Sequence, residues 1–107
     1  MEDLFHALAA PARQQILDVL TERDGQTLFE ICTGLVPRTS LSRQAISQHL
    51  DVLEDCGLVR SSKAGRVRTY QLAPQPLKAV EGWLAKQRTL WTRRLDQLDD
   101  YLKEQKR

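Results

Sequence analysis

Residues 42–59, SRQAISQHLDVLEDCGLV, form the stretch around which the remainder of this chain is arranged. At the roughly 100° per residue of an α-helix, its apolar side chains gather on one side and its polar side chains on the other. Ser42 suits the N-cap of such a helix, and Gly57 suits the position just past its end, where φ is positive. The stretch therefore predicts an amphipathic helix over residues 42–57. Its apolar side holds Ala45, Ile46, His49, Leu50, Val52, Leu53 and Cys56.

The polar side of this helix changes character along its length. The first half carries basic and hydrogen-bonding groups, Arg43, Gln44, Ser47 and Gln48, whereas the second half carries the acids Asp51, Glu54 and Asp55. Carboxylates repel phosphates, while arginine and glutamine pair with guanine and adenine edges in the major groove. This polarity favours a helix that enters the major groove by its N-terminal turns. A polar face that is simply solvated is the alternative interpretation.

The length and the charge of the chain favour a small protein with a localised basic region. With 107 residues, one domain over residues 1–107 is expected, and a second chain often completes a core of that size. The net charge is only +2, but it is unevenly distributed. Residues 1–37 hold two arginines and six acidic residues, whereas residues 58–72 hold Arg60, Lys63, Arg66 and Arg68 and no acidic residue. The basic charge thus follows directly after the polar helix.

Two cysteines, Cys32 and Cys56, are too few for a disulfide framework. Each falls on the apolar side of a predicted helix, so we expect reduced core residues of a cytoplasmic protein. The sequence shows neither a signal peptide nor an apolar run of about 18 residues, so neither secretion nor a membrane span is expected.

The first 40 residues predict three short helices. Residues 4–8 favour a short opening helix, and Pro11 suits the first position of a second helix that runs to about residue 22. Thr27 and Glu30 form a capping-box pattern that begins a third helix, which ends near residue 34. A loop over residues 36–40 then leads into the polar-faced helix. A short helix, a turn and a longer helix in this order are typical of a helix-turn-helix.

After Gly57 the apolar pattern changes from helical to extended. Residues 58–72 predict a β-hairpin with its turn at residues 64–65. Arg66 and Arg68 lie near the predicted tip, beyond the reach of the core. Such a tip suits a phosphate backbone or a minor groove. A charged strand edge that prevents aggregation is the alternative interpretation.

Residues 74–105 predict one long helix of roughly 45 Å. Its wide apolar stripe, with two tryptophans, exceeds what a small domain needs, so we expect a dimer interface that the opening helix joins. A membrane-surface helix is the rival interpretation, but the polar face mixes basic and acidic residues. The predicted interface residues are Leu4, Phe5, Leu77, Val80, Trp83, Leu84, Trp91, Leu95, Leu98 and Leu102.

With these elements in place, the chain resembles the ArsR/SmtB family of winged helix-turn-helix bacterial repressors along nearly its full length. The resemblance rests on FHALAAPARQQILDVL at residues 5–20, on SRQAISQHLDVLEDCGLV, and on GRVRTYQL at residues 65–72. It implies a mainly α fold with a two-stranded β-hairpin wing and a long C-terminal dimerisation helix. It also implies a homodimer that binds a palindromic operator on double-stranded DNA, often its own promoter, and represses it.

By the same resemblance, the first turns of the polar-faced helix carry DNA recognition. These turns run from Ser42 to His49. The residues nearest the bases would be Arg43, Gln44, Ser47 and Gln48. The residues near phosphates would be Thr39, Ser40, Lys63, Arg66 and Arg68. For His49 a hydrogen-bonded structural role is favoured over a phosphate contact, since half-buried imidazoles usually have an internal partner.

Three features depart from the family pattern. Ala10 stands where an aspartate commonly caps the second helix, and the loop at residues 36–39 lengthens the linker before the recognition helix. Metal-sensing relatives often carry a CVC-type pair on the third helix, but here Cys32 matches the first cysteine and Gly34 stands at the second. The two histidines of the chain both lie outside the last helix. Neither a metal site nor a cofactor is therefore predicted.

The leading hypothesis is a sequence-specific DNA-binding transcriptional regulator, a homodimeric repressor of its own or a neighbouring operon, whose inducer is unknown. One alternative is a metal- or redox-responsive sensor with the same fold, and another is a protein-interaction module that uses the last helix. An enzyme is not expected, because the sequence shows no nucleophile with a base, no paired carboxylates on a buried face and no phosphate-binding glycine-rich loop.

Overall fold

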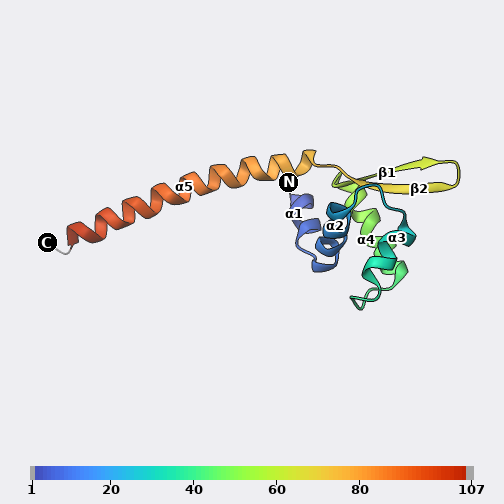
Figure 1. The fold of residues 1–107 in the computed structure, drawn as a ribbon. Helices are drawn as coiled ribbons and strands as arrows, with labels where there is room; N and C mark the ends of the chain where they lie inside the picture. Colours follow the sequence, from blue (N-terminus) through green and yellow to red (C-terminus); the bar gives the residue numbers. More distant parts are fainter. Residues whose placement is uncertain (1, 106–107) are drawn as a thin grey trace. The chain divides into compact units, whose positions relative to one another are not determined.

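The computed structural model describes residues 2–105 as five helices and one β-hairpin (Figure 1). In chain order these elements are α1 (Glu2–Leu8), α2 (Pro11–Glu22), α3 (Leu28–Leu35), α4 (Arg43–Asp55), β1 (Val59–Ala64), β2 (Val67–Leu72) and α5 (Gln75–Gln105). They belong to two compact units, Met1–Pro76 and Leu77–Arg107, and each unit is described by itself. The mainly helical fold with a two-stranded hairpin and a long last helix is confirmed. A single domain over residues 1–107 stays a prediction.

The helix ends of the first unit follow their local sequence signals. The Thr27 Oγ1 accepts a hydrogen bond from the Glu30 backbone N–H at 3.2 Å, and the Thr27 backbone N–H donates to Glu30 Oε1 at 3.1 Å, which confirms the capping box. Ser42 caps α4, because its Oγ accepts from the Ala45 backbone N–H at 3.1 Å. At Ala10, by contrast, α2 begins without a side-chain cap. The start of α4, which carries the predicted recognition residues, is therefore firmly defined.

The core of the first unit joins α2, α3, α4 and the base of the hairpin. Its largest fully buried side chains are Ile16, Leu20, Ile31, Ile46, Leu50, Leu53, Leu58 and Val59. Two residues predicted on the buried side of α4 lie elsewhere. Val52 is 38% exposed, because it lies roughly 120° around the helix from Ile46. Cys56 is only half-buried, because it follows the last turn of α4 at the C-cap.

The hairpin is antiparallel, with Val59 opposite Leu72 at its base and Ala64 opposite Val67 at its tip. Its two-residue turn consists of Gly65 and Arg66, one residue later than predicted. Gly65 has a φ of 64°, and among the described residues only glycines have a positive φ. Glycine at the first turn position and an ordinary residue at the second are typical of a type II′ turn. This preference places the turn one residue later than predicted, with Arg66 at the tip of the hairpin.

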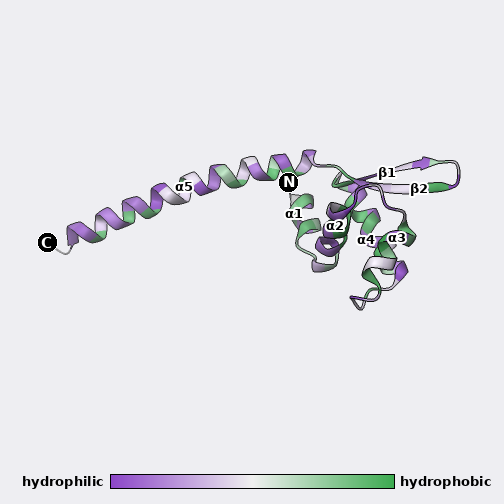
Figure 2. Cartoon of the chain, viewed as in Figure 1, coloured by the Kyte–Doolittle hydropathy of each residue, from purple (hydrophilic) through white to green (hydrophobic). Residues whose placement is uncertain are grey.

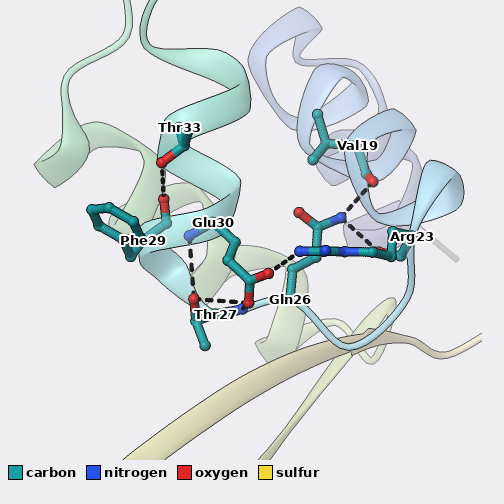
Figure 3. A network of polar contacts seen from close by, with 7 residues as sticks. All are labelled: Val19, Arg23, Gln26, Thr27, Phe29, Glu30 and Thr33. Carbon is teal, nitrogen blue, oxygen red and sulfur yellow. Dashed lines mark hydrogen bonds and ion pairs between the residues drawn. The ribbon is translucent and has the colours of Figure 1, made fainter.

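The wing is tied to the helices by a contact that the sequence pattern did not reveal. The backbones of Gln26 and Tyr70 exchange two hydrogen bonds, of 3.1 and 2.8 Å. The buried Gln26 side chain donates through Nε2 to the carbonyl oxygens of Val19, at 2.8 Å, and Arg23, at 2.6 Å (Figure 3). The side chain of Arg23 in turn forms an ion pair with Glu30. This network holds β2 against the connection between α2 and α3.

Helix α5 is amphipathic, and apart from the buried Val80 its apolar side chains are largely exposed. Hydrophobic and hydrophilic stretches interleave along the helix (Figure 2). Its most exposed large apolar side chains, all at least 49% exposed, are Leu84, Trp91, Leu95, Leu98, Tyr101 and Leu102. Among the described residues, none of the helices combines the length and the apolarity that crossing a membrane requires.

Candidate nucleic-acid interface

The first half of α4 presents an unengaged polar surface. Ile46, Leu50 and Leu53 fix one side of the helix in the core, so Gln44 and Gln48 are exposed on the opposite side. Arg43 is exposed as the first residue of α4, on a flank of the buried side. Within residues 2–105, no hydrogen bond or ion pair engages these three side chains. Side chains in this state can reach base edges without first giving up an internal partner.

The loop before α4 contributes two hydroxyls with different environments. The Thr39 Oγ1 donates to the Leu35 carbonyl oxygen at 2.8 Å and accepts from the Leu41 backbone N–H at 3.2 Å. Its only hydrogen is therefore committed to the loop, which weakens the prediction that Thr39 binds a phosphate. Ser42 uses only an acceptor lone pair for its cap, so its hydroxyl hydrogen remains available to a phosphate oxygen. Ser40, the neighbouring candidate, is exposed.

The wing tip concentrates three exposed cations. Lys63 and Arg68 face each other directly across the two strands, and Arg66 occupies the turn. Like charges directly opposite each other destabilise a hairpin. No acidic side chain within the described residues pairs with any of the three. An anion such as a phosphate would relieve this repulsion.

Two of the wing cations, Lys63 and Arg68, lie on the same face of the hairpin as a contact with α4. Ser61 pairs with Tyr70 across the strands, and the Ser61 Oγ donates to Glu54 Oε1 at 2.9 Å. Because alternate strand residues share a face, Lys63 and Arg68 lie on the face that Ser61 turns toward α4. The bond to Ser61 also engages the carboxylate of Glu54, one of the three acids of α4.

His49 has an internal partner. The Arg13 Nη1–H donates to His49 Nδ1 at 3.4 Å, and both side chains are half-buried. This contact supports the structural role predicted for His49, whereas a phosphate contact stays a prediction. Sequence reasoning did not select Arg13, because 36 positions separate it from His49 and no local pattern pairs them.

The residues predicted for the dimer interface fall into a buried group and an exposed group. Leu4 and Val80 are each only 8% exposed, so they have little surface left to bury against a second chain. Both belong to the buried side chains of this chain, which weakens the prediction that they line a dimer interface. Phe5 is half-buried. The other predicted interface residues, all at least 38% exposed, are Leu77, Trp83, Leu84, Trp91, Leu95, Leu98 and Leu102.

Metal ligands do not gather anywhere in the described part of the chain: no group of three or more His, Cys, Asp or Glu residues could hold an ion. His6 and Cys56 line one shallow cleft together with Asp3 and Asp55, but they form no such group. Burial raises the pKa of the Cys32 thiol, against the opposing effect of the Arg43 charge. A raised pKa keeps Cys32 in the unreactive thiol form at neutral pH.

Comparison with known proteins identifies related sequences and structures. Residues 8–62 match the family model of a helix-turn-helix domain. The uncharacterized HTH-type transcriptional regulator YuzN of Bacillus subtilis is 44% identical over 84 residues, which cover 76% of this chain and 91% of that protein. The arsenical resistance operon repressor of Escherichia coli is 32% identical over 83 residues, 78% of this chain and 64% of the repressor. An ArsR-like transcriptional regulator from Rhodococcus sp. RHA1 is similar in structure, with a TM-score of 0.75, 32% identity and coverage of 96% and 90%.

Proposed function

Since this chain belongs to the ArsR family of winged helix-turn-helix transcriptional regulators, which bind DNA, we propose that it is a homodimeric repressor of its own or a neighbouring operon. The observation that carries this proposal is the first half of α4. There, Arg43, Gln44 and Gln48 are exposed and unengaged within the described chain, while the acids of the helix lie further along.

In the proposed complex, the N-terminal turns of α4 enter the major groove. Arg43 suits guanine, and Gln44 and Gln48 suit adenine, because their side chains can form bidentate hydrogen bonds with those base edges. Ser40 and Ser42 contact phosphates beside the groove. Lys63, Arg66 and Arg68 contact the backbone or the adjacent minor groove, which makes binding strongly salt-dependent.

The homodimer is proposed from the surface of α5. The exposed leucines and tryptophans of this helix form an apolar stripe, which stays in contact with water unless a second chain covers it. Its charges are also unequally placed: residues 75–95 hold five basic residues and one acidic residue, whereas residues 96–105 hold four acidic residues and one basic residue. Two antiparallel α5 helices would therefore bring opposite charges together. The two-fold symmetry of such a dimer implies a palindromic operator.

An operator lies on chromosomal DNA, so we infer that the protein works in the cytoplasm, without a membrane partner and without catalysing a reaction.

Two pairs of variants test this function. The probe is a duplex enriched by the wild-type protein from a random-sequence library, compared with a scrambled duplex. Gln44→Ala and Gln48→Ala should each lose roughly 1–3 kcal/mol of preference for the enriched duplex and retain their affinity for the scrambled one. Arg66→Ala and Arg68→Ala should weaken binding to both duplexes and flatten the salt dependence. Unchanged affinity in all four variants would contradict the proposed function.

A further inference from the structure

Arg13, in the first turn of α2, joins α1 to the recognition helix. Its Nε–H donates to the Ala7 carbonyl oxygen at 2.8 Å, and its Nη2–H donates to the His6 carbonyl oxygen at 3.2 Å, both at the end of α1. Its Nη1–H donates to His49 Nδ1 at 3.4 Å. One guanidinium thus holds two carbonyl groups of α1 and the imidazole of α4.

The two bonds to α1 determine where the third bond points. The last carbonyls of a helix have no partner within the helix, and a cation is favoured beside them. A guanidinium is a planar fork, so fixing two of its nitrogens on α1 also fixes the direction of the third N–H. Gln14 caps the same end of α1, through Nε2 to the Leu8 carbonyl oxygen at 2.6 Å, but it makes no hydrogen bond to α4 within the described residues.

The position of His49 on α4 makes this bond relevant to DNA recognition. The buried stripe of α4 packs through apolar contacts, which have little directional preference. His49 and Glu54 lie on opposite flanks of that stripe, at roughly 100° per residue, and bond to Arg13 and Ser61 respectively. Hydrogen bonds are directional, so these two bonds add a restraint on the rotation of α4 about its own axis to the one that burial of Ile46, Leu50 and Leu53 supplies.

We propose that Arg13 is a positioning residue for sequence-specific DNA binding. By holding His49, it refines the rotation of α4 at which Gln44 and Gln48 face base edges. This inference rests on the proposed role of α4 in recognition. Arginine only donates, so His49 Nδ1 accepts and the imidazole proton resides on Nε2. Non-specific binding depends on phosphate contacts, so loss of the Arg13–His49 bond should lower specificity and leave non-specific affinity unchanged.

The test compares variants at both ends of the bond. Arg13→Lys keeps the charge but loses the fork, and His49→Leu keeps the size but loses the acceptor. Each should lower the ratio of affinities for the enriched and scrambled duplexes by about tenfold, as expected for one lost hydrogen bond to a charged group. The double variant should be no worse than the worse single variant, because both changes remove the same contact. His49→Gln, whose Oε1 can accept from Arg13, should restore most of the ratio.

Gln14→Met is the matched control, because it removes a cap from the same end of α1 without touching the bond to His49. It should leave the ratio unchanged. A second readout is the imidazole ¹⁵N spectrum, in which the Nδ1 signal should shift in Arg13→Lys and not in Gln14→Met.

Two results would overturn the inference: an unchanged ratio in both Arg13→Lys and His49→Leu, or an equal loss in Gln14→Met. If Arg13→Lys does not fold, the His49→Leu and His49→Gln pair decides the question. A wild-type protein that enriches no duplex would overturn the proposed function, and this inference with it.

Discussion

At the scale of single residues, two hydroxyls in the loop before α4 serve different purposes. The Thr39 hydroxyl donates to the Leu35 carbonyl oxygen and accepts from the Leu41 backbone N–H, so its hydrogen is committed to the loop. Ser42 accepts from the Ala45 backbone N–H and keeps its hydrogen. The same side chain can therefore cap α4 and contact a phosphate, which makes Ser42 the more informative position to change.

Ser42→Ala should destabilise the protein by about 0.5–2 kcal/mol, because it leaves the Ala45 N–H without its cap. The measurement is urea unfolding, at one protein concentration because a dimer's stability depends on it. Ser40→Ala is the control: that side chain is exposed, and the change should stay within about 0.5 kcal/mol. Equal effects of the two substitutions would show that Ser42 is not the cap.

At the scale of elements, the sequence predicted those features that local chemistry determines. The capping box at Thr27, the cap at Ser42 and the positive φ at Gly57 each depend on residues a few positions apart. The hairpin was predicted too, but its turn was placed one residue early. A dipeptide such as Ala64-Gly65 does not reveal which turn position its glycine takes; the strand register settles that.

Contacts between distant elements could not be predicted in this way. The bridge between Gln26 and Tyr70 and the bond from Arg13 to His49 depend on how the helices pack, and no periodic pattern encodes them. The exposure of Gln44 and Gln48 was predictable, because burial of one side of a helix exposes the other. The hydrogen bond of Thr39 to Leu35 and the burial of Leu4 were not predictable from the pattern, because both depend on the folded structure.

Two glycine substitutions test the assignment of the hairpin turn and of α5. They should change the free energy of unfolding in opposite directions. Gly65→Ala should lower the free energy of unfolding by roughly 1–2 kcal/mol, because Gly65 has a φ of 64° and an L-residue is strained there. Gly82→Ala should stabilise by about 1 kcal/mol, because Gly82 lies inside α5 with nothing within 4 Å of an added Cβ. Urea unfolding of both variants gives the comparison. A stabilising Gly65→Ala would contradict the type II′ turn.

At the scale of the whole molecule, the central relation is between self-association and DNA binding. Leu95→Glu places a charge on the exposed apolar stripe of α5, where Leu95 is 61% exposed, so it should weaken a homodimer and lower operator affinity together. Thr89→Glu adds the same charge to the opposite side of the helix and should change neither. Sedimentation equilibrium and binding to the enriched duplex measure the two effects. A Leu95→Glu protein that dimerises as the wild type does would place the interface elsewhere.

The central claim is that this chain recognises a specific DNA sequence through α4. Its most direct test is the fluorescence anisotropy of the metal-free protein on the DNA upstream of its own gene and on a scrambled duplex, at two salt concentrations. We expect tight binding to the upstream duplex, weak binding to the scrambled one, and a steep loss of both with salt. Equal, weak binding to the two duplexes at both salt concentrations would contradict the claim.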